Sequence, residues 1–434
     1  MRLLRQRAIN GEITEKIKRA AEREGVSPEE IREGVANGTA VVLGSNINSA
    51  AEPLAVGTGL TAKVSASVGL YGGNSSIEGE IEKIRAALDA GTDALMDLSV
   101  SGDIEAMRGK TLAISKKPVG TLPLYQTLAE SAKKYGSSLK MTDGDILEMI
   151  ERHAKGGVDF IALHCGTTRE VIDRAKRERR VDPLVSYGGS HLIGWMLHND
   201  RENPLYERFD DVLEIAAKYD VTLSFADGMR PGCLSDSLDG AQVHELVILG
   251  ELTARAQAVG VQVMVKGPGH VPLAQIKTTI ALQKRLCHGA PYFVFGPLVT
   301  DTAAGYDHIS AAIGGAISAW AGAEFICCVT PAEHIGIPNS KQVREGVIAA
   351  RIAAHAGDLG RGMPGAVRWD RELSVARKKL DWGAQIKLSV DPATCENVWK
   401  DRSGAFSSKC TMCGPYCAME IVTAYLDIAN VHEC

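Results

Sequence analysis

Residues 221–270, VTLSFADGMR PGCLSDSLDG AQVHELVILG ELTARAQAVG VQVMVKGPGH, contain two short apolar segments separated by a longer segment of helical character. Both apolar segments run into glycine and ionisable residues, ADGMR at 226–230 and KGPGH at 266–270. A strand, a helix and another strand in this order form the repeating unit of a parallel sheet. The stretch therefore predicts an α/β fold with polar groups at the carboxyl ends of its strands.

The same alternation extends over residues 61–330. Nine segments are candidate strands: Ala62–Gly69, Ala94–Val100, Pro118–Tyr125, Asp159–Gly166, Pro183–Gly188, Val221–Asp227, Val261–Gly267, Tyr292–Thr300 and Phe325–Thr330. Helical stretches lie between them at 78–90, 144–155, 168–180, 208–219, 240–259, 273–287 and 308–321. So many repeats favour a (β/α)8 barrel over an open sheet. A barrel has eight places for nine candidates, so we expect one candidate to lie outside it.

The flanking regions have a different character. Residues 1–60 read as a helical and loop region, with a capping-box helix start at Ser27, Pro28 and Glu30. The barrel is expected over 61–360. Beyond residue 340, segments 341–357 and 370–382 read as helices. The C-terminal part, residues 361–434, continues through a polar stretch at 389–408 to a cysteine-rich tail.

Composition excludes several classes of function. The 434 residues are 45% hydrophobic and 23% charged, which is enough to bury a large core. Lys plus Arg is 48 and Asp plus Glu is 53, so a net charge of −5 gives no basic surface for nucleic acid or anionic membranes. The sequence has no apolar run long enough for a transmembrane helix and no signal-peptide core, so we expect a cytoplasmic protein. In that reducing compartment its ten cysteines are metal ligands, catalytic groups or core residues rather than disulfides.

The segment Cys410-Thr-Met-Cys413-Gly-Pro-Tyr-Cys417 has the spacing C-x2-C-x3-C. Three thiolates this close can meet one metal centre, and they suit an iron–sulfur cluster with one iron left without a protein ligand. Such an iron can bind S-adenosylmethionine. The spacing leaves two alternatives open, a zinc knuckle completed by His432 or Cys434 and a redox-active cysteine pair.

Three of the eleven histidines lie in Gly- or acid-rich segments after candidate strands: His270, His308 and His334. His270 and His334 follow different strands, and a closed barrel could bring them to one rim. Neutral imidazoles suit a divalent zinc or iron, so this pair is a candidate for a second metal site. His164, at the end of an apolar segment, is a candidate for hydrogen bonding to a substrate.

Eight segments together resemble the phosphomethylpyrimidine synthases of thiamine biosynthesis, and the likeness runs from about residue 5 to the C-terminal cysteines. They are Lys63–Gly69, Met96–Ser99, Pro123–Gln126, Asp227–Gly232, Gly267–Pro272, Gly296–Asp301, Gly305–His308 and Val329–His334. The resemblance implies a (β/α)8 barrel with a C-terminal cluster domain, acting on 5-aminoimidazole ribotide. It further implies a homodimer in which the cluster of one chain serves the barrel of the other.

The resemblance also implies the ligands of each group. Cys410, Cys413 and Cys417 would hold a [4Fe–4S] cluster, and His270 and His334 a zinc or iron(II) ion beside S-adenosylmethionine. The candidate substrate-binding residues are Ser67, Met96, Tyr125, His164, Ser186, Gly188, Gly189, Asp227, Arg230 and Lys266, with the two glycines offering amides to the phosphate. The candidate catalytic residues are Lys266, Tyr187, Asp227 and Glu333.

The chain departs from the pyrimidine synthases at strand ends. Their K-V-N-A-N-I-G, V-S-R-G-G, G-D-G and E-G-P-G-H correspond here to segments with Ser65 and Ser67, Tyr187, Ala226 and Lys266. Exchanging an acid for a base changes the local charge by two units, which can redirect proton transfers. This pattern resembles the paralogous 5-hydroxybenzimidazole synthases, which make the lower-ligand base of anaerobic cobamides from the same ribotide.

The resemblance implies a mechanism in which a 5′-deoxyadenosyl radical abstracts hydrogen from the ribose of the ribotide. The barrel would position the substrate and exclude water, and Lys266 and Tyr187 would direct the intermediate toward the benzimidazole. A flavodoxin or ferredoxin is the expected electron donor. Pyrimidine synthesis from the same substrate is the alternative within the family. A zinc-stabilised binding protein that has lost catalysis is the alternative from another class.

Overall fold

In the computed structural model, residues 3–48, 51–403, 412, 416–419 and 421–422 are described. The chain divides into two compact units, residues 1–361 and 362–434. No helix among the described residues is both long and apolar enough to cross a membrane.

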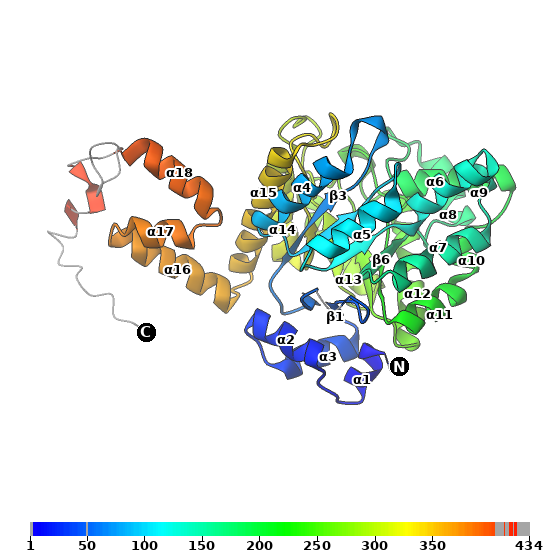
Figure 1. The fold of residues 1–434 in the computed structure, drawn as a ribbon, viewed down its shortest axis with the longest axis horizontal. Helices are drawn as coiled ribbons and strands as arrows, with labels where there is room; N and C mark the ends of the chain where they lie inside the picture. Colours follow the sequence, from blue (N-terminus) through cyan, green and yellow to red (C-terminus); the bar gives the residue numbers. More distant parts are fainter. Residues whose placement is uncertain (1–2, 49–50, 404–411, 413–415, 420, 423–434) are drawn as a thin grey trace. The chain divides into compact units, whose positions relative to one another are not determined.

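The first unit contains a closed barrel of eight parallel strands in the order β10-β3-β4-β5-β6-β7-β8-β9 (Figure 1), so the predicted (β/α)8 barrel is confirmed. The strands are β3 (Lys63–Val68), β4 (Ala94–Asp97), β5 (Val119–Thr121), β6 (Phe160–Leu163), β7 (Thr222–Phe225), β8 (Val263–Lys266), β9 (Tyr292–Phe295) and β10 (Phe325–Cys327). They are almost entirely buried, as expected for strands with the barrel interior on one side and helices on the other.

Helices cover the outside of the barrel. They are α4 (Ile77–Asp89), α5 (Ile104–Ile114), α6 (Pro123–Tyr135), α7 (Asp143–Lys155), α8 (Arg169–Glu178), α9 (Tyr187–Asn199), α10 (Pro204–Glu207), α11 (Phe209–Tyr219), α12 (Gly240–Ala258), α13 (Ile276–Leu286), α14 (Asp307–Ala321) and α15 (Ser340–Gly360). Many of them begin at a side-chain cap, such as Ser76 for α4, Asp239 for α12 and Asn339 for α15.

Two candidate strands need correction. Pro183–Gly188 is not a strand, because its residues run as a loop into α9, where the Ser186 hydroxyl caps the helix by accepting from the Gly189 amide. The predicted strand Pro118–Tyr125 stops at Thr121, because Pro123 supplies the first residue of α6. Removing the first segment leaves eight strands for the eight places of the barrel.

The N-terminal region begins with α1 (Leu4–Ile9), α2 (Glu15–Glu24) and α3 (Pro28–Asn37), and the capping box at Ser27 and Glu30 is present as predicted. It also holds an antiparallel hairpin of β1 (Ala40–Leu43) and β2 (Leu54–Gly57), which the sequence analysis missed. Apolar side chains of the hairpin pack with interior residues at the beginnings of the barrel strands. The hairpin therefore closes the amino-terminal end of the barrel, and the opposite end is left for a site.

The second unit contains α16 (Pro364–Lys378), α17 (Trp382–Leu388) and α18 (Pro392–Ser403). The rings of Trp382 and Trp399 stack with centroids 4.1 Å apart, and the Trp369 indole donates to the Leu388 carbonyl at 2.7 Å. These aromatic contacts join α16, α17 and α18, whose buried side chains in the described part of the unit are those of Ala366 and Ala376.

Candidate active site

Lys266 ends β8 with its side chain inside the barrel. The strand register places it in one layer with inward-facing residues of alternate strands: Met96 on β4, Ala162 on β6 and Cys327 on β10. Its amine lies 3.7 Å from the Met96 sulfur and 4.8 Å from the centre of the Phe293 ring. Among the described residues no carboxylate forms an ion pair with this buried amine. Burial lowers the pKa of Lys266, and the nearby Arg230 acts in the same direction.

Asp227 follows β7 and is also buried. Neither carboxyl oxygen has a hydrogen-bond partner among the described residues, and the nearest cation, Arg230 Nη1, is 3.8 Å from Oδ1. Burial raises the pKa of Asp227 from 3.8 to about 6, against the opposing effects of Arg230 and Lys266. A buried carboxylate without a donor costs stability unless a ligand supplies one, so this group is suited to bind a substrate.

A test of this interpretation is the pH dependence of stability. The native pKa of Asp227 is raised, so the favourable neutral form is fully present below pH 3.8 and is lost as the pH rises through about 6. We expect Asp227→Asn to stabilise the ligand-free protein at pH 8 by up to about 3 kcal/mol, at about 1.36 kcal/mol per pKa unit, and by less at pH 5. Urea unfolding at both pH values measures this. The exposed Asp200→Asn is the control, and equal pH profiles for the two variants would contradict the assignment.

His164 and α9 lie side by side at the carboxyl end of β6. His164 Nε2 is 3.1 Å from the Ser186 hydroxyl, and its Nδ1 is buried with no partner in the described chain. Burial, with Arg230 and Lys266 nearby, lowers the pKa of His164 to about 3, so the imidazole is neutral. A Cβ on Gly188 would come within 2.3 Å of the His164 ring, which explains why glycine occupies this position. The first amides of α9 are thus close to an imidazole nitrogen that is free to bond a ligand.

Tyr187 begins α9 and is 41% exposed. Its ring meets Tyr125 edge to face at 4.9 Å and lies tilted against His191 at 4.2 Å. Tyr125 itself is buried, which raises its pKa to about 12. Tyr187 and Lys266 share no contact, so the two candidate product-determining residues belong to separate clusters.

The remaining candidate residues, Ser67, Arg230 and Glu333, differ in the contacts they make with the site. Ser67 faces the barrel interior with its hydroxyl 3.5 Å from the Cys327 sulfur. Arg230 lies over the Phe295 ring at 5.8 Å. Desolvation raises the pKa of the Glu333 carboxyl, against a backbone hydrogen bond from Thr330 and the nearby His334. Glu333 thus lies beside the His270 and His334 pair, and its catalytic role stays a prediction.

His270 and His334 are brought together, with their Nε2 atoms 3.3 Å apart. Each Nδ1 lies beside a carboxylate, Asp301 Oδ1 at 2.8 Å for His270 and Asp307 Oδ1 at 2.9 Å for His334. A carboxylate on Nδ1 fixes the ring and leaves Nε2 free as a ligand. His308 does not join them: it is half-buried, with its Nδ1 unbonded among the described residues. That described part also contains no group of three or more His, Cys, Asp or Glu suited to hold a metal.

Three cysteines of the C-terminal tail are the proposed ligands of the iron–sulfur cluster. Cys410 and Cys413 lie outside the described residues, and Cys417 is a half-buried free thiol. The proposed cluster ligands therefore rest on their spacing in the sequence.

Comparison with known proteins identifies the family. A model of the radical SAM ThiC family matches residues 4–424. The chain belongs to the radical SAM ThiC family. It is 66% identical over 424 residues to a 5-hydroxybenzimidazole synthase from Moorella thermoacetica, covering 98% of both chains, and 62% identical to one from Eubacterium limosum, covering 98% of this chain and 99% of that one. A phosphomethylpyrimidine synthase from Desulforamulus reducens is 54% identical over 96% of both chains.

These matches confirm the resemblance that the sequence motifs indicated, and the chain is a radical SAM enzyme of the ThiC family. They do not support a zinc-stabilised protein without catalysis. The structure adds residues that the motifs did not assign to the site. Asp301 and Asp307 lie within the quoted motifs, but the sequence analysis gave them no function. Glu245 on α12, which bonds the backbone next to Asp227, lies in no motif.

Proposed function

We propose that this ThiC-family protein is a 5-hydroxybenzimidazole synthase, which converts 5-aminoimidazole ribotide into the lower-ligand base of cobamides. The observation that carries the proposal is the identity of 66% and 62% to two proteins with that name, against 54% to a phosphomethylpyrimidine synthase. Lys266 supports it, because a buried amine occupies the barrel position where the pyrimidine synthases have a glutamate. Pyrimidine synthesis is the alternative, because this chain also matches the phosphomethylpyrimidine synthase over 96% of its length.

The ribotide is assigned to the carboxyl end of the barrel. Gly188 and Gly189 in the first turn of α9 would bind the phosphate through their amides, with the Gly189 amide exchanging its bond to the Ser186 hydroxyl for one to the phosphate. Asp227 and the Nδ1 of His164 have no partners in the described chain and would bond the sugar or the aminoimidazole. Ser67, Met96, Tyr125, Ser186, Arg230 and Lys266 complete the proposed substrate contacts.

The His270 and His334 pair fits a divalent metal. Two nitrogens at about 2.0–2.1 Å from a tetrahedral zinc are about 3.3 Å apart, which is the Nε2 separation in this structure. With two protein ligands, further positions would be open to water, and S-adenosylmethionine would lie beside the metal. We assign zinc or iron(II) to this pair, held in orientation by Asp301 and Asp307.

Cys410, Cys413 and Cys417 would hold the [4Fe–4S] cluster. When bound, the reduced cluster supplies the electron that cleaves S-adenosylmethionine to a carbon radical. The protein's own residues hold the ribotide in one orientation and exclude water from it. A flavodoxin or ferredoxin in the cytoplasm is the proposed electron donor.

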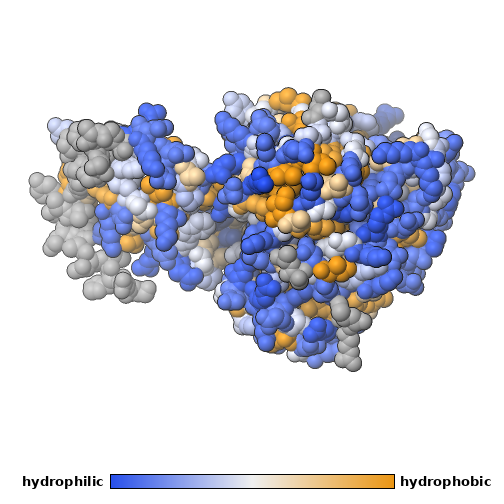
Figure 2. Space-filling model, in the orientation of Figure 1, coloured by the Kyte–Doolittle hydropathy of each residue, from blue (hydrophilic) through white to orange (hydrophobic). Residues whose placement is uncertain are grey.

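The barrel unit has an apolar surface suited to a second copy of the chain. Figure 2 shows an apolar patch in the region where Figure 1 labels α4, α14 and α15. Ile309, Ile313 and Trp320 are half exposed on one side of α14, and Ile352 is half exposed on α15. Contiguous exposed apolar side chains of this kind mark interaction surfaces. They support association with a second copy. The service of the partner's barrel by one chain's cluster tail is what the family resemblance implies.

The deciding experiment is an anaerobic assay of the reconstituted protein with ribotide, S-adenosylmethionine and a reductant. We expect 5-hydroxybenzimidazole, identified by fluorescence and mass, with one zinc or iron beyond the four cluster irons and a dimer in light scattering. A phosphorylated pyrimidine as the sole product would replace the proposal by its alternative.

A further inference from the structure

Glu245 on α12 is a buried carboxylate that joins two segments of the candidate site. Its Oε1 accepts from the Thr167 hydroxyl at 2.6 Å and from the Gly228 amide at 3.0 Å, and its Oε2 accepts from the Met229 amide at 2.8 Å. Thr167 belongs to the segment after β6, and Gly228 and Met229 belong to the segment after β7. One side chain thus bonds the strand-end segments of two neighbouring strands.

Both segments carry proposed substrate ligands. Thr167 lies three residues after His164, and the two amides lie between Asp227 and Arg230. Packing at this junction is close: a Cβ on Gly228 would lie 2.1 Å from the Thr167 hydroxyl oxygen. The first turn of α9 meets the same point, since a Cβ on Gly189 would lie 2.7 Å from the Gly228 Cα. A small shift of residues 227–230 would therefore move them against Thr167 in the segment that follows His164, and against the first turn of α9, where the phosphate is proposed to bind.

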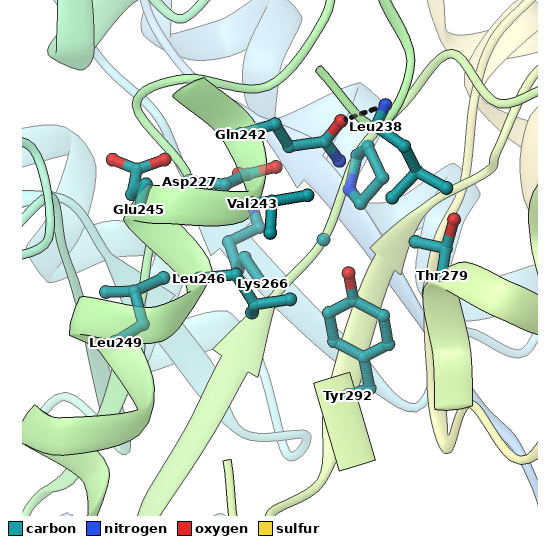
Figure 3. A pocket seen from close by; sticks show the side chains of 12 residues that line it. Asp227, Leu238, Gln242, Val243, Glu245, Leu246, Leu249, Lys266, Thr279 and Tyr292 are labelled. Carbon is teal, nitrogen blue, oxygen red and sulfur yellow. Dashed lines mark hydrogen bonds between the residues drawn. The ribbon is translucent and has the colours of Figure 1, made fainter. Parts of the chain in front are cut away.

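Glu245 lines a cavity behind this rim together with Asp227, Lys266 and Tyr292, as Figure 3 shows. The carboxylate makes three hydrogen bonds as an acceptor and none as a donor, which is the pattern of the ionised form. Its burial and the nearby Asp227 raise its pKa to about 7 all the same. The three donors thus favour the ionised form in a place where burial disfavours it.

We propose that Glu245 is a positioning residue for the ribotide site, which acts through the backbone of Gly228 and Met229 to fix Asp227 and Arg230 relative to His164. The inference rests on the proposed function, because it takes the ribotide as the ligand of those three residues. Glu245 does not touch the substrate. The two buried amides need an acceptor, and Glu245 is the one that the structure provides.

The test is Glu245→Gln, which keeps the volume but turns an NH2 group toward a backbone or hydroxyl donor. We expect ribotide binding, measured by equilibrium dialysis without S-adenosylmethionine, to weaken about tenfold or more. In the assay, 5′-deoxyadenosine formed per product should rise, because a misplaced substrate is attacked less often. The matched control is Glu251→Gln, an exposed glutamate on the same helix, which should bind the ribotide as the wild type does.

A purely structural role would lower the folded fraction without changing the affinity of the folded protein. Binding by folded Glu245→Gln within twofold of the wild type would therefore overturn the inference. If this variant does not fold, Thr167→Val decides, because it removes only the hydroxyl donor. We expect it to weaken binding about threefold, and unchanged binding would overturn the inference. Failure of the wild type to bind the ribotide would instead refute the proposed function.

Discussion

Replacement of Cys417 by serine is expected to abolish S-adenosylmethionine cleavage in the reconstituted protein. Of the three cysteines in the C-x2-C-x3-C motif, Cys417 is the one that the structure describes, as a half-buried free thiol. A cluster with one open iron needs all three thiolates, and a serine oxygen is a far poorer ligand for iron–sulfur clusters. The variant should show little bound iron and sulfide, and 5′-deoxyadenosine formation should fall to the background rate.

The matched control is Cys395→Ser. Cys395 lies in α18 of the same C-terminal unit and is also a half-buried free thiol, but it stands outside the motif. It should retain the four-iron spectrum and full cleavage activity. A Cys417→Ser protein that keeps both would refute the cluster assignment. Loss of bound zinc rather than iron would favour the zinc knuckle that the spacing alone leaves open.

The sequence predicted the barrel well because its strands are set by local patterns. Short apolar runs alternate with helical stretches over residues 61–330, and eight of these runs contain the eight strands. The ninth, Pro183–Gly188, failed because Ser186 and the two glycines after Tyr187 can equally begin a helix, and only tertiary contacts decide between these outcomes. The β1–β2 hairpin was missed because its two four-residue strands carry no alternation of polar and apolar residues.

The site was predictable to the extent that it follows strand ends. His270 and His334 are distant in sequence, and barrel closure alone brought them to 3.3 Å. The contacts that orient them were not predictable, because a motif does not say which aspartate faces which imidazole nitrogen. Glu245 is the clearest case. It sits on a long helix among apolar and charged residues, and the amides that it accepts from lie 16 and 17 positions away in the chain. Spacing within α12 therefore gives no signal for its role.

The double variant Lys266→Glu, Tyr187→Arg is expected to lose 5-hydroxybenzimidazole formation by on the order of 10³-fold. The Lys266 amine lies over the face of the Phe293 ring, which attracts a cation and repels an anion. A glutamate in its place would carry negative charge inside the barrel, where Asp227 already has no hydrogen-bond partner among the described residues. Tyr187→Arg also removes the aromatic contacts to Tyr125 and His191.

The measurement separates charge reversal from general damage. Cleavage of S-adenosylmethionine, followed as 5′-deoxyadenosine, should continue, because neither residue belongs to the cluster motif or to the His270 and His334 pair. Fluorescence and mass then report how the ribotide is partitioned between the benzimidazole and the pyrimidine. Lys266→Met removes the charge with little change in volume, and Lys341→Glu makes the same charge reversal at an exposed position. The double variant could still make only 5-hydroxybenzimidazole at the wild-type rate. In that case neither the charge of Lys266 nor the aromatic contacts of Tyr187 direct the product.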